Sequence, residues 1–223
     1  ALIDFVLRDH PVGLEELRRH PEGMRFGKPE EPRKYEKGQL RDDGKPGFPT
    51  PSGKVEIASS VLAKHGFDAL PTYTEPSEGP SANPELAREY PLVLNTGARI
   101  QSTYRSQHLN IPGLLAMQPV PQVLIHPDDA AVRGIADGNL VHVRTPRGCV
   151  PFYARVTDAV MTGGVELNVG GGGPIQAEAW SRANANYLTD FAGRDPISGF
   201  PTYKALLCEV ENVSLEEERQ AAA

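Results

Sequence analysis

A dense group of hydrogen-bond donors follows a short apolar segment in residues 94–113, which read LNTGARIQSTYRSQHLNIPG. The apolar residues before it predict a strand, and Asn95, Thr96 and Gly97 predict the turn that ends this strand. Gly97 permits close approach of a ligand to the backbone, and Arg99 offers a planar fork suited to phosphate or a fused polar heterocycle. For this segment taken alone, a solvated loop is the alternative interpretation.

Two further segments have the composition of binding loops. Residues 170–174 read GGGGP, and glycines before a helix could expose free amides to a phosphate. This run lacks the Gly-Lys-Ser/Thr of a Walker motif, and close packing against neighbouring backbone explains it equally well. Residues 184–190 read NANYLTD, in which asparagine supplies both donor and acceptor, although termination of a helix would also favour asparagine.

The elements that must position these groups are mainly short strands. Alternating apolar residues predict strands at residues 54–57, 91–94, 120–125, 140–145, 150–156, 165–169 and 202–210. Short helices are predicted at residues 11–17, 59–65 and 128–134. We interpret His126 and Asp128 as the exit of a strand and the cap of the following helix. This pattern predicts a mainly β protein built as a compact barrel with a few short helices.

A linker of prolines and small polar residues at 71–84 divides the sequence. We expect residues 1–84 to be an irregular α/β tail of a preceding domain together with this linker. Residues 85–213 are expected to form the barrel, and residues 214–223 a disordered tail.

Composition excludes several classes of function. The formal charge of −6 argues against non-specific nucleic-acid binding, and no apolar run of about 18 residues is present to cross a membrane. Cys149 and Cys208 lie far apart, outside any zinc-like spacing and inside apolar strand patterns. Buried free thiols are therefore expected, and a disulfide between them stays open.

Four segments in a fixed order resemble the C-terminal part of the molybdopterin oxidoreductases, the dimethyl sulfoxide reductase family. They are residues 47–56 (GFPTPSGKVE), 94–113, 184–190 and 196–201 (PISGFP). The resemblance runs from Phe48 to Glu211. It implies that the barrel is a double-psi β-barrel, and that the parent enzyme uses molybdenum or tungsten held by two molybdopterin guanine dinucleotides.

The resemblance also implies which residues bind the cofactor. In this family the loop after the first barrel strand lies over a pterin, and an asparagine of an N-x-L-T segment, matched here by Asn186, contacts the pterin edge. The residues predicted to bind the cofactor are Thr96, Gly97, Ala98, Arg99, Ser106, Gln107, His108, Asn184 and Asn186.

No catalytic or metal-ligating residue is predicted in this chain. The sequence has no cysteine cluster for an iron–sulfur centre, so any such cluster is expected in the parent only. The metal ligand is expected upstream of Ala1, which predicts an excised C-terminal portion that is inactive alone. Its expected partners are the remaining domains of the parent and electron-transfer subunits, without nucleic acid or membrane insertion. We expect a soluble protein. Its compartment, either the prokaryotic cytoplasm or the periplasm, stays open at this level.

Two rival functions remain at this level. A stand-alone double-psi barrel could act as an interaction or substrate-recognition module, but such a module would not need the donor-rich loop. A small hydrolase using His108 and Asp128 is the second alternative.

Overall fold

The computed structural model describes residues 2–25, 31–98, 100, 107 and 109–213. The chain divides into two compact units, Ala1–Thr72 and Tyr73–Ala223. This division falls at the start of the proline-rich stretch expected to be a linker. The barrel limits of 85–213 stay a prediction, and the tail expected at 214–223 lies outside the described residues.

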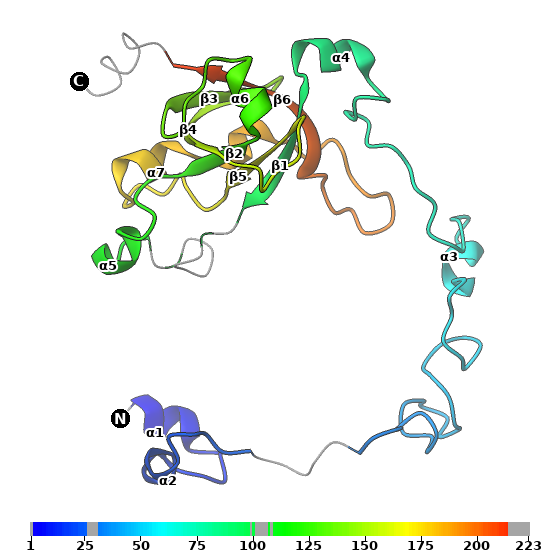
Figure 1. Ribbon diagram of the computed structural model, residues 1–223. Coiled ribbons are helices and arrows are strands. Elements are labelled where there is room, and N and C mark those ends of the chain that lie inside the picture. The colour runs from blue at the N-terminus through cyan, green and yellow to red at the C-terminus, as the bar shows by residue number, and fades with distance from the viewer. Residues whose placement is uncertain (1, 26–30, 99, 101–106, 108, 214–223) are drawn as a thin grey trace. The chain divides into compact units, whose positions relative to one another are not determined.

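Six strands of the second unit form a closed barrel in which β6 pairs back to β1 (Figure 1). The spatial order is β1-β5-β2-β4-β3-β6. β1 is parallel to β5 and β2 is parallel to β4, whereas the other four neighbouring pairs are antiparallel. The predicted mainly β barrel is thereby confirmed as a six-stranded mixed barrel. Its strands are β1 (Leu92–Ala98), β2 (Gln122–Ile125), β3 (Leu140–Thr145), β4 (Gly148–Val156), β5 (Gly164–Asn168) and β6 (Lys204–Asn212).

Alternation along the strands fills the barrel with aliphatic side chains. On β4, Val150, Phe152 and Ala154 are buried, and on β3 the buried residues include Val141 and Val143. Each fully buried side chain of this kind contributes roughly 1.5–3 kcal/mol relative to an exposed one. The barrel is therefore a packed core and not a channel, so a ligand must bind at its ends or its outer surface.

The two cysteines occupy different environments. Cys208 is buried in the barrel core, as expected for a free thiol. Cys149 is exposed, which corrects the expectation that it is buried. The period-two alternation explains the difference, because Cys149 precedes the inward-facing Val150 and so points outward.

Short helices flank the barrel, and most of them were not predicted. They are α4 (Pro84–Glu89), α5 (Pro112–Leu115), α6 (Pro127–Ala131), α7 (Glu178–Arg182) and the 3₁₀ turn η1 (Ala185–Leu188). Only α6 was expected. Its cap is His126 and not Asp128, because the Nδ1 atom of His126 accepts a hydrogen bond from the backbone N–H of Asp128 at 3.2 Å.

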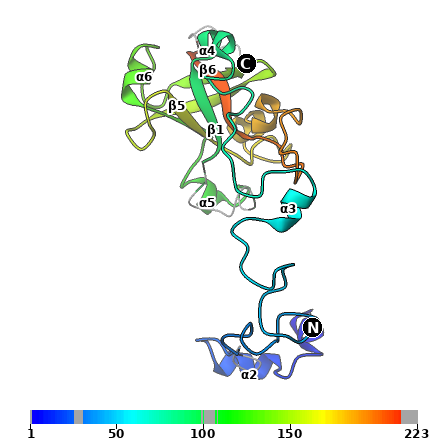
Figure 2. The same ribbon diagram turned by 90° about the vertical axis from the view of Figure 1, so that its right-hand side faces the viewer.

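The barrel has two distinct ends, defined by the register of its parallel pair β1 and β5. Val93 pairs with Gly164 at one end, and Ala98 pairs with Asn168 at the other. α6 lies at the end of Gly164, and α5 lies beyond the end of Asn168 (Figures 1 and 2). Ala98 and Gln122, the last residue of β1 and the first residue of β2, both contact Asn168 and so lie at this second end.

The first unit contains α1 (Leu2–Leu7), α2 (Leu14–Arg19) and α3 (Ser60–Lys64). α2 and α3 were predicted, and the hydroxyl oxygen of Ser59 caps α3 by accepting the backbone N–H of Leu62. The strand predicted at residues 54–57 is wrong: these residues have no strand partner among those described, and Ile57 is exposed. Instead, the side chain and backbone N–H of Ser52, followed by those of Ser60, donate to Glu56 and lower the pKa of its carboxyl to about 2.

Candidate functional site

Thr96 and Gly97 lie where β1 meets the start of β6. The Thr96 hydroxyl donates a hydrogen bond to the Tyr203 carbonyl oxygen at 2.6 Å. Gly97 has φ +142°, and the pairing of β1 with β5 shifts register between Thr96 and Ala98. The predicted turn at residues 95–97 is therefore wrong, because β1 continues to Ala98 and Gly97 makes an irregularity within it.

Asn184 and Asn186 lie at the 3₁₀ turn η1. The Oδ1 atom of half-buried Asn184 accepts a hydrogen bond from the backbone N–H of Asn186 at 3.1 Å and caps the turn. Leu188, at the other end of the turn, is buried, and its carbonyl oxygen accepts a hydrogen bond from the Thr145 hydroxyl at 3.1 Å. The side chain of Asn186 is exposed and makes no hydrogen bond within the described part of the chain.

These two segments line one cavity of about 470 Å³ at the end of the barrel. Residues from β1, η1 and the approach to β6 meet there, and apolar atoms form most of its wall. Thr96, Gly97 and Asn186 all lie on this wall, beside Phe200 and Lys204. The neighbouring residues Thr96 and Gly97 are therefore brought together with Asn186, which is distant from them in sequence.

A second hollow, of about 550 Å³, also has Gly97 in its wall. Ala98, Gln118, Arg155 and Asn168 are among the residues that line it. Arg155 makes no ion pair within the described residues, whereas the first cavity has its own cation in Lys204. Gly97 lines both hollows and so forms part of the boundary between them.

Not every predicted site residue reaches these cavities. Asn184 lines neither one, because its side chain caps η1. Gln107 is exposed and also lines neither cavity. The predictions for Arg99, Ser106 and His108 lie outside the described residues. The hydrolase alternative, which pairs His108 with Asp128, gains no geometric support for the same reason.

The glycine run 170–174 is explained by packing. A Cβ atom at Gly171 would lie 2.3 Å from the Ala183 carbonyl oxygen, and one at Gly172 would lie 2.7 Å from the Cβ atom of Asn184. Gly172 also has φ +100° and donates its N–H to the carbonyl oxygen of Trp180 at 2.9 Å. These glycines let the chain pass close to α7 and to Asn184, as the packing interpretation of the run predicted.

Sequence reasoning missed Asn168 and Trp180. Asn168 is a buried carboxamide at the end of β5, and Trp180 is fully buried against Ile100 and Leu109. A polar side chain in the apolar pattern of residues 165–169 was a usable signal for Asn168. The only tryptophan of the chain was a signal for a second core.

An ion-pair cluster lies beside the cavity. Arg147 donates from Nε to Asp190 at 2.5 Å and from its two terminal nitrogens to the carboxylate of Glu78. The Arg147 guanidinium, with a smaller contribution from the Ala192 backbone N–H, holds the pKa of the Asp190 carboxyl below its usual value. This cluster ties the residues after η1 to the β3–β4 hairpin.

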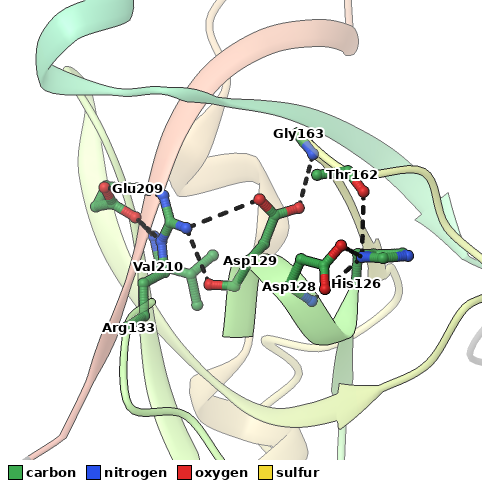
Figure 3. Close-up of polar contacts among 8 residues, drawn as sticks. All are labelled: His126, Asp128, Asp129, Arg133, Thr162, Gly163, Glu209 and Val210. Carbon is green, nitrogen blue, oxygen red and sulfur yellow. Dashed lines mark hydrogen bonds and ion pairs between the residues drawn. The ribbon is translucent and has the colours of Figure 1, made fainter. Parts of the chain in front are cut away.

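A second polar cluster lies at the opposite end of the barrel, around α6 (Figure 3). His126 Nδ1 lies 3.2 Å from the Thr162 hydroxyl, and Asp129 accepts the backbone N–H of Gly163 at 2.6 Å. Arg133 pairs with Glu209 at 2.6 Å. Each of these polar groups has a partner within the cluster, so it fastens α6 and the β5 start to the barrel.

The described residues contain neither a metal-binding cluster nor a membrane-spanning helix. No group of three or more His, Cys, Asp or Glu side chains in this part of the chain could hold a metal ion. Within the same residues, no helix is long and apolar enough to cross a membrane.

The closed barrel carries a mostly apolar cavity at one end and a second hollow along the outer side of β2, β4 and β5, which is the arrangement of a ligand-binding domain. Residues 92–207, a little over half of the chain, match the family described as Molydopterin dinucleotide binding domain. The chain belongs to this family, as the resemblance to the dimethyl sulfoxide reductase family predicted.

Named relatives share this similarity over a small part of their length. Dopamine dehydroxylase of Eggerthella lenta is 34% identical over 189 residues, which cover 82% of this chain and 18% of that protein. Acetylene hydratase of Syntrophotalea acetylenica is 39% identical over 122 residues, covering 54% and 17%. The dimethyl sulfoxide/trimethylamine N-oxide reductase of Rhodobacter capsulatus is 38% identical over 133 residues, covering 55% and 15%.

A solved structure gives the same result. Acetylene hydratase from Pelobacter acetylenicus superimposes with a TM-score of 0.73 at 28% identity, covering 95% of this chain and 29% of that chain. The chain spans less than a fifth of the length of the three curated relatives. It therefore corresponds to a fraction of larger enzymes of this family.

Proposed function

We propose that this chain is the C-terminal cofactor-binding part of a molybdenum or tungsten enzyme of the dimethyl sulfoxide reductase family. In this proposal it covers and orients the pterins of two molybdopterin guanine dinucleotides. The observation that carries the proposal is the shared cavity of Thr96, Gly97 and Asn186 at one end of the barrel.

The chemistry of this cavity suits a pterin. Its volume of about 470 Å³ falls in the range of roughly 300–1,000 Å³ usual for small-molecule sites. The Asn186 carboxamide offers a donor and an acceptor, as the polar edge of a pterin requires, and the mostly apolar wall suits the ring faces. Lys204 places a cation at the same wall, where it would meet the anionic part of the cofactor.

The residues of this chain would bind and orient the cofactor rather than react with substrate. When bound, the cofactor supplies oxygen-atom transfer or transfer of a proton and two electrons at its metal. We assign this chain no catalytic residue and no metal ligand, so alone it would be inactive. The metal ligand, the remaining domains and electron-transfer subunits would complete the parent enzyme.

The proposal does not extend to a substrate. The named relatives include a hydratase, a dehydroxylase and a reductase. Because similar sequences occur in proteins with such different names, the similarity of this chain to them does not assign a reaction.

Replacement of Asn186 tests the proposal in the full-length parent enzyme. Asn186→Ala removes a carboxamide that lines the cavity and makes no described side-chain hydrogen bond of its own. We expect molybdenum or tungsten and pterin content to fall about two- to tenfold, the equivalent of one net hydrogen bond. Metal is measured by mass spectrometry and pterin by fluorescence after oxidation.

Asn212→Ala is the matched control. The Asn212 carboxamide donates to the Gly134 carbonyl oxygen at 3.0 Å beside α6, away from the cavity. This variant should keep the wild-type metal and pterin content. Equal content in the Asn186 variant and the wild type, or a purified parent enzyme without pterin, would overturn the proposed function.

A further inference from the structure

We infer that Asn168 is a positioning residue for the cofactor site: its carboxamide fastens both places where residues 98–122 leave and rejoin the barrel. This inference rests on the proposed function, since it concerns the backbone at Gly97 and Ala98 between the two hollows. Asn168 belongs to β5, so a neighbouring strand would control the geometry of this edge.

Three hydrogen bonds converge on the Asn168 side chain. Oδ1 accepts from the Gln122 backbone N–H at 2.7 Å and from Gln118 Nε2 at 2.5 Å. Nδ2 donates to the Ala98 carbonyl oxygen at 3.1 Å. One side chain thus joins the end of β1, the start of β2 and the residues just before β2.

The orientation of this carboxamide is fixed by its partners. The Gln122 backbone N–H can only donate, so it requires Oδ1, and the Ala98 carbonyl oxygen can only accept, so it requires Nδ2. No carboxylate or aliphatic side chain of similar size can meet both demands. Asn168 is only 3% exposed, so water cannot easily replace a lost partner.

Gln118 makes a second hydrogen bond, through its backbone. Its backbone carbonyl oxygen accepts a hydrogen bond from Trp180 Nε1 at 3.3 Å, while its side chain reaches Asn168. Trp180 also packs with Ile100 and Leu109, which belong to the same part of the chain. The described residues between β1 and β2 are therefore tied to the barrel by a polar contact and by a small apolar core.

The consequence concerns the shape of the site. Gly97 lines both hollows, Ala98 lines the second, and Asn168 holds the Ala98 carbonyl oxygen. Without this hydrogen bond, the peptide plane after Ala98 can rotate, and the boundary between the hollows loses its fixed geometry. The cofactor would then bind to a less ordered surface and pay the ordering entropy on binding.

Asn168→Asp is the decisive variant in the full-length parent enzyme. Aspartate can still accept from Gln122 and Gln118, but it faces the Ala98 carbonyl oxygen without a donor. We expect hydrogen exchange to rise at the amides of Gly97, Ala98 and Ile100, and pterin retention during dialysis to weaken on the order of tenfold.

Asp129→Ala is the stability-matched control. It removes the 2.6 Å contact from Gly163 N–H to the Asp129 carboxylate at the opposite end of the barrel. It should lower thermal stability while pterin retention and exchange at residues 97–100 stay at wild-type values. Equal loss of pterin in both variants would reduce Asn168 to a general stabilising residue and overturn the inference.

Gln118→Met decides the question if the Asn168 variant does not fold. Methionine keeps the length of the side chain in the wall of the second hollow, removes its hydrogen bond to Oδ1 and leaves Asn168 its two backbone partners. We expect a folded enzyme with a smaller loss of pterin, and wild-type retention would overturn the inference. If only this inference is wrong, Asn186→Ala still lowers the pterin content. If the proposed function is wrong, none of these substitutions changes the pterin content.

Discussion

The carboxamide of Asn184 accepts the backbone N–H of Asn186 at 3.1 Å, which assigns different tasks to two asparagines only two residues apart. Asn184 is half-buried behind the turn, and Asn186 is exposed on the cavity wall. The capping bond fixes the backbone from which the Asn186 side chain projects. Asn184 is therefore a positioning residue in the proposed site, and Asn186 is its contact residue.

Substitution of Asn184 should separate capping of the turn from contact with the cofactor. Asn184→Asp keeps the acceptor that caps η1, whereas Asn184→Ala removes it. We expect the alanine variant to lose about 1 kcal/mol of unfolding free energy, typical of a lost cap, and the aspartate variant to stay near wild type. Denaturant unfolding measures the first effect, and pterin content should follow the same order.

A different order would contradict this assignment. If Asn184 contacts the cofactor directly through its amide nitrogen, Asn184→Asp would lose pterin as severely as Asn184→Ala, although its stability is preserved.

Gly172 should tolerate no side chain. A Cβ atom there would lie 2.7 Å from the Asn184 Cβ atom, and φ of +100° disfavours any L residue. We expect Gly172→Ala to lower the unfolding free energy by about 1–3 kcal/mol, as measured by denaturant unfolding. It should also displace Asn184 and with it the capped turn.

Gly113→Ala is the control for this prediction. No atom lies within 4 Å of a Cβ atom at Gly113, which is part of α5. Alanine there should be neutral or stabilising by roughly 0.5–1 kcal/mol. Equal destabilisation of the two variants would show that close packing of Gly172 against Asn184 is unimportant.

The barrel strands were predictable because each has a local alternation of apolar and polar residues. Val141 and Val143 alternate with outward-facing residues on one strand, and Val150 and Phe152 do so on the next, so local patterning fixes both the element and its buried face. Residues 54–57 show the limit of this reasoning. Their alternation is as regular, yet without a neighbouring strand the pattern produces no sheet.

The site was predictable in part. A resemblance of ordered motifs identified Gly97 and Asn186, which the fold brings to one cavity. Asn184 has the same side chain as Asn186, and the preference of asparagine for helix ends, noted from the sequence, did not show which of the two caps the turn. Asn168 was missed because its importance comes from contacts with Ala98 and Gln118, which are distant in sequence.

Arg147 should contribute stability that depends on pH. Its side chain is 17% exposed and bonds the carboxylates of Glu78 and Asp190. We expect Arg147→Met to lower the unfolding free energy by about 1–3 kcal/mol at neutral pH, since the half-buried carboxylate of Glu78 loses its partner. Arg182→Met is the control, because its pair with Glu178 is exposed and should be worth less than about 1 kcal/mol.

The direction of the pH effect follows from Asp190. Arg147 lowers the folded-state pKa of this carboxyl below the ordinary 3.8. The contribution of Asp190 is therefore complete above pH 3.8 and disappears as pH falls through the lowered folded-state value. The difference between wild type and Arg147→Met should narrow in that acidic window, and denaturant unfolding from pH 7 to pH 2.5 measures it. A constant difference across the range would mean that Arg147 stabilises the fold by packing alone.

The thiol of Cys208 should be unreactive toward alkylating reagents in the folded protein. Burial in the barrel core, reinforced by the nearby Glu209 carboxylate, raises the pKa of its thiol well above the usual range. Because the thiolate is the reactive form, a Cys149→Ser background should react with an alkylating reagent at pH 8 only as fast as the barrel unfolds. The labelling rate, followed by mass spectrometry, should rise steeply with denaturant. Rapid labelling without denaturant would mean that β6 opens locally. The buried side chains of Leu207 and Val210 would then be insufficient to keep β6 in the closed barrel.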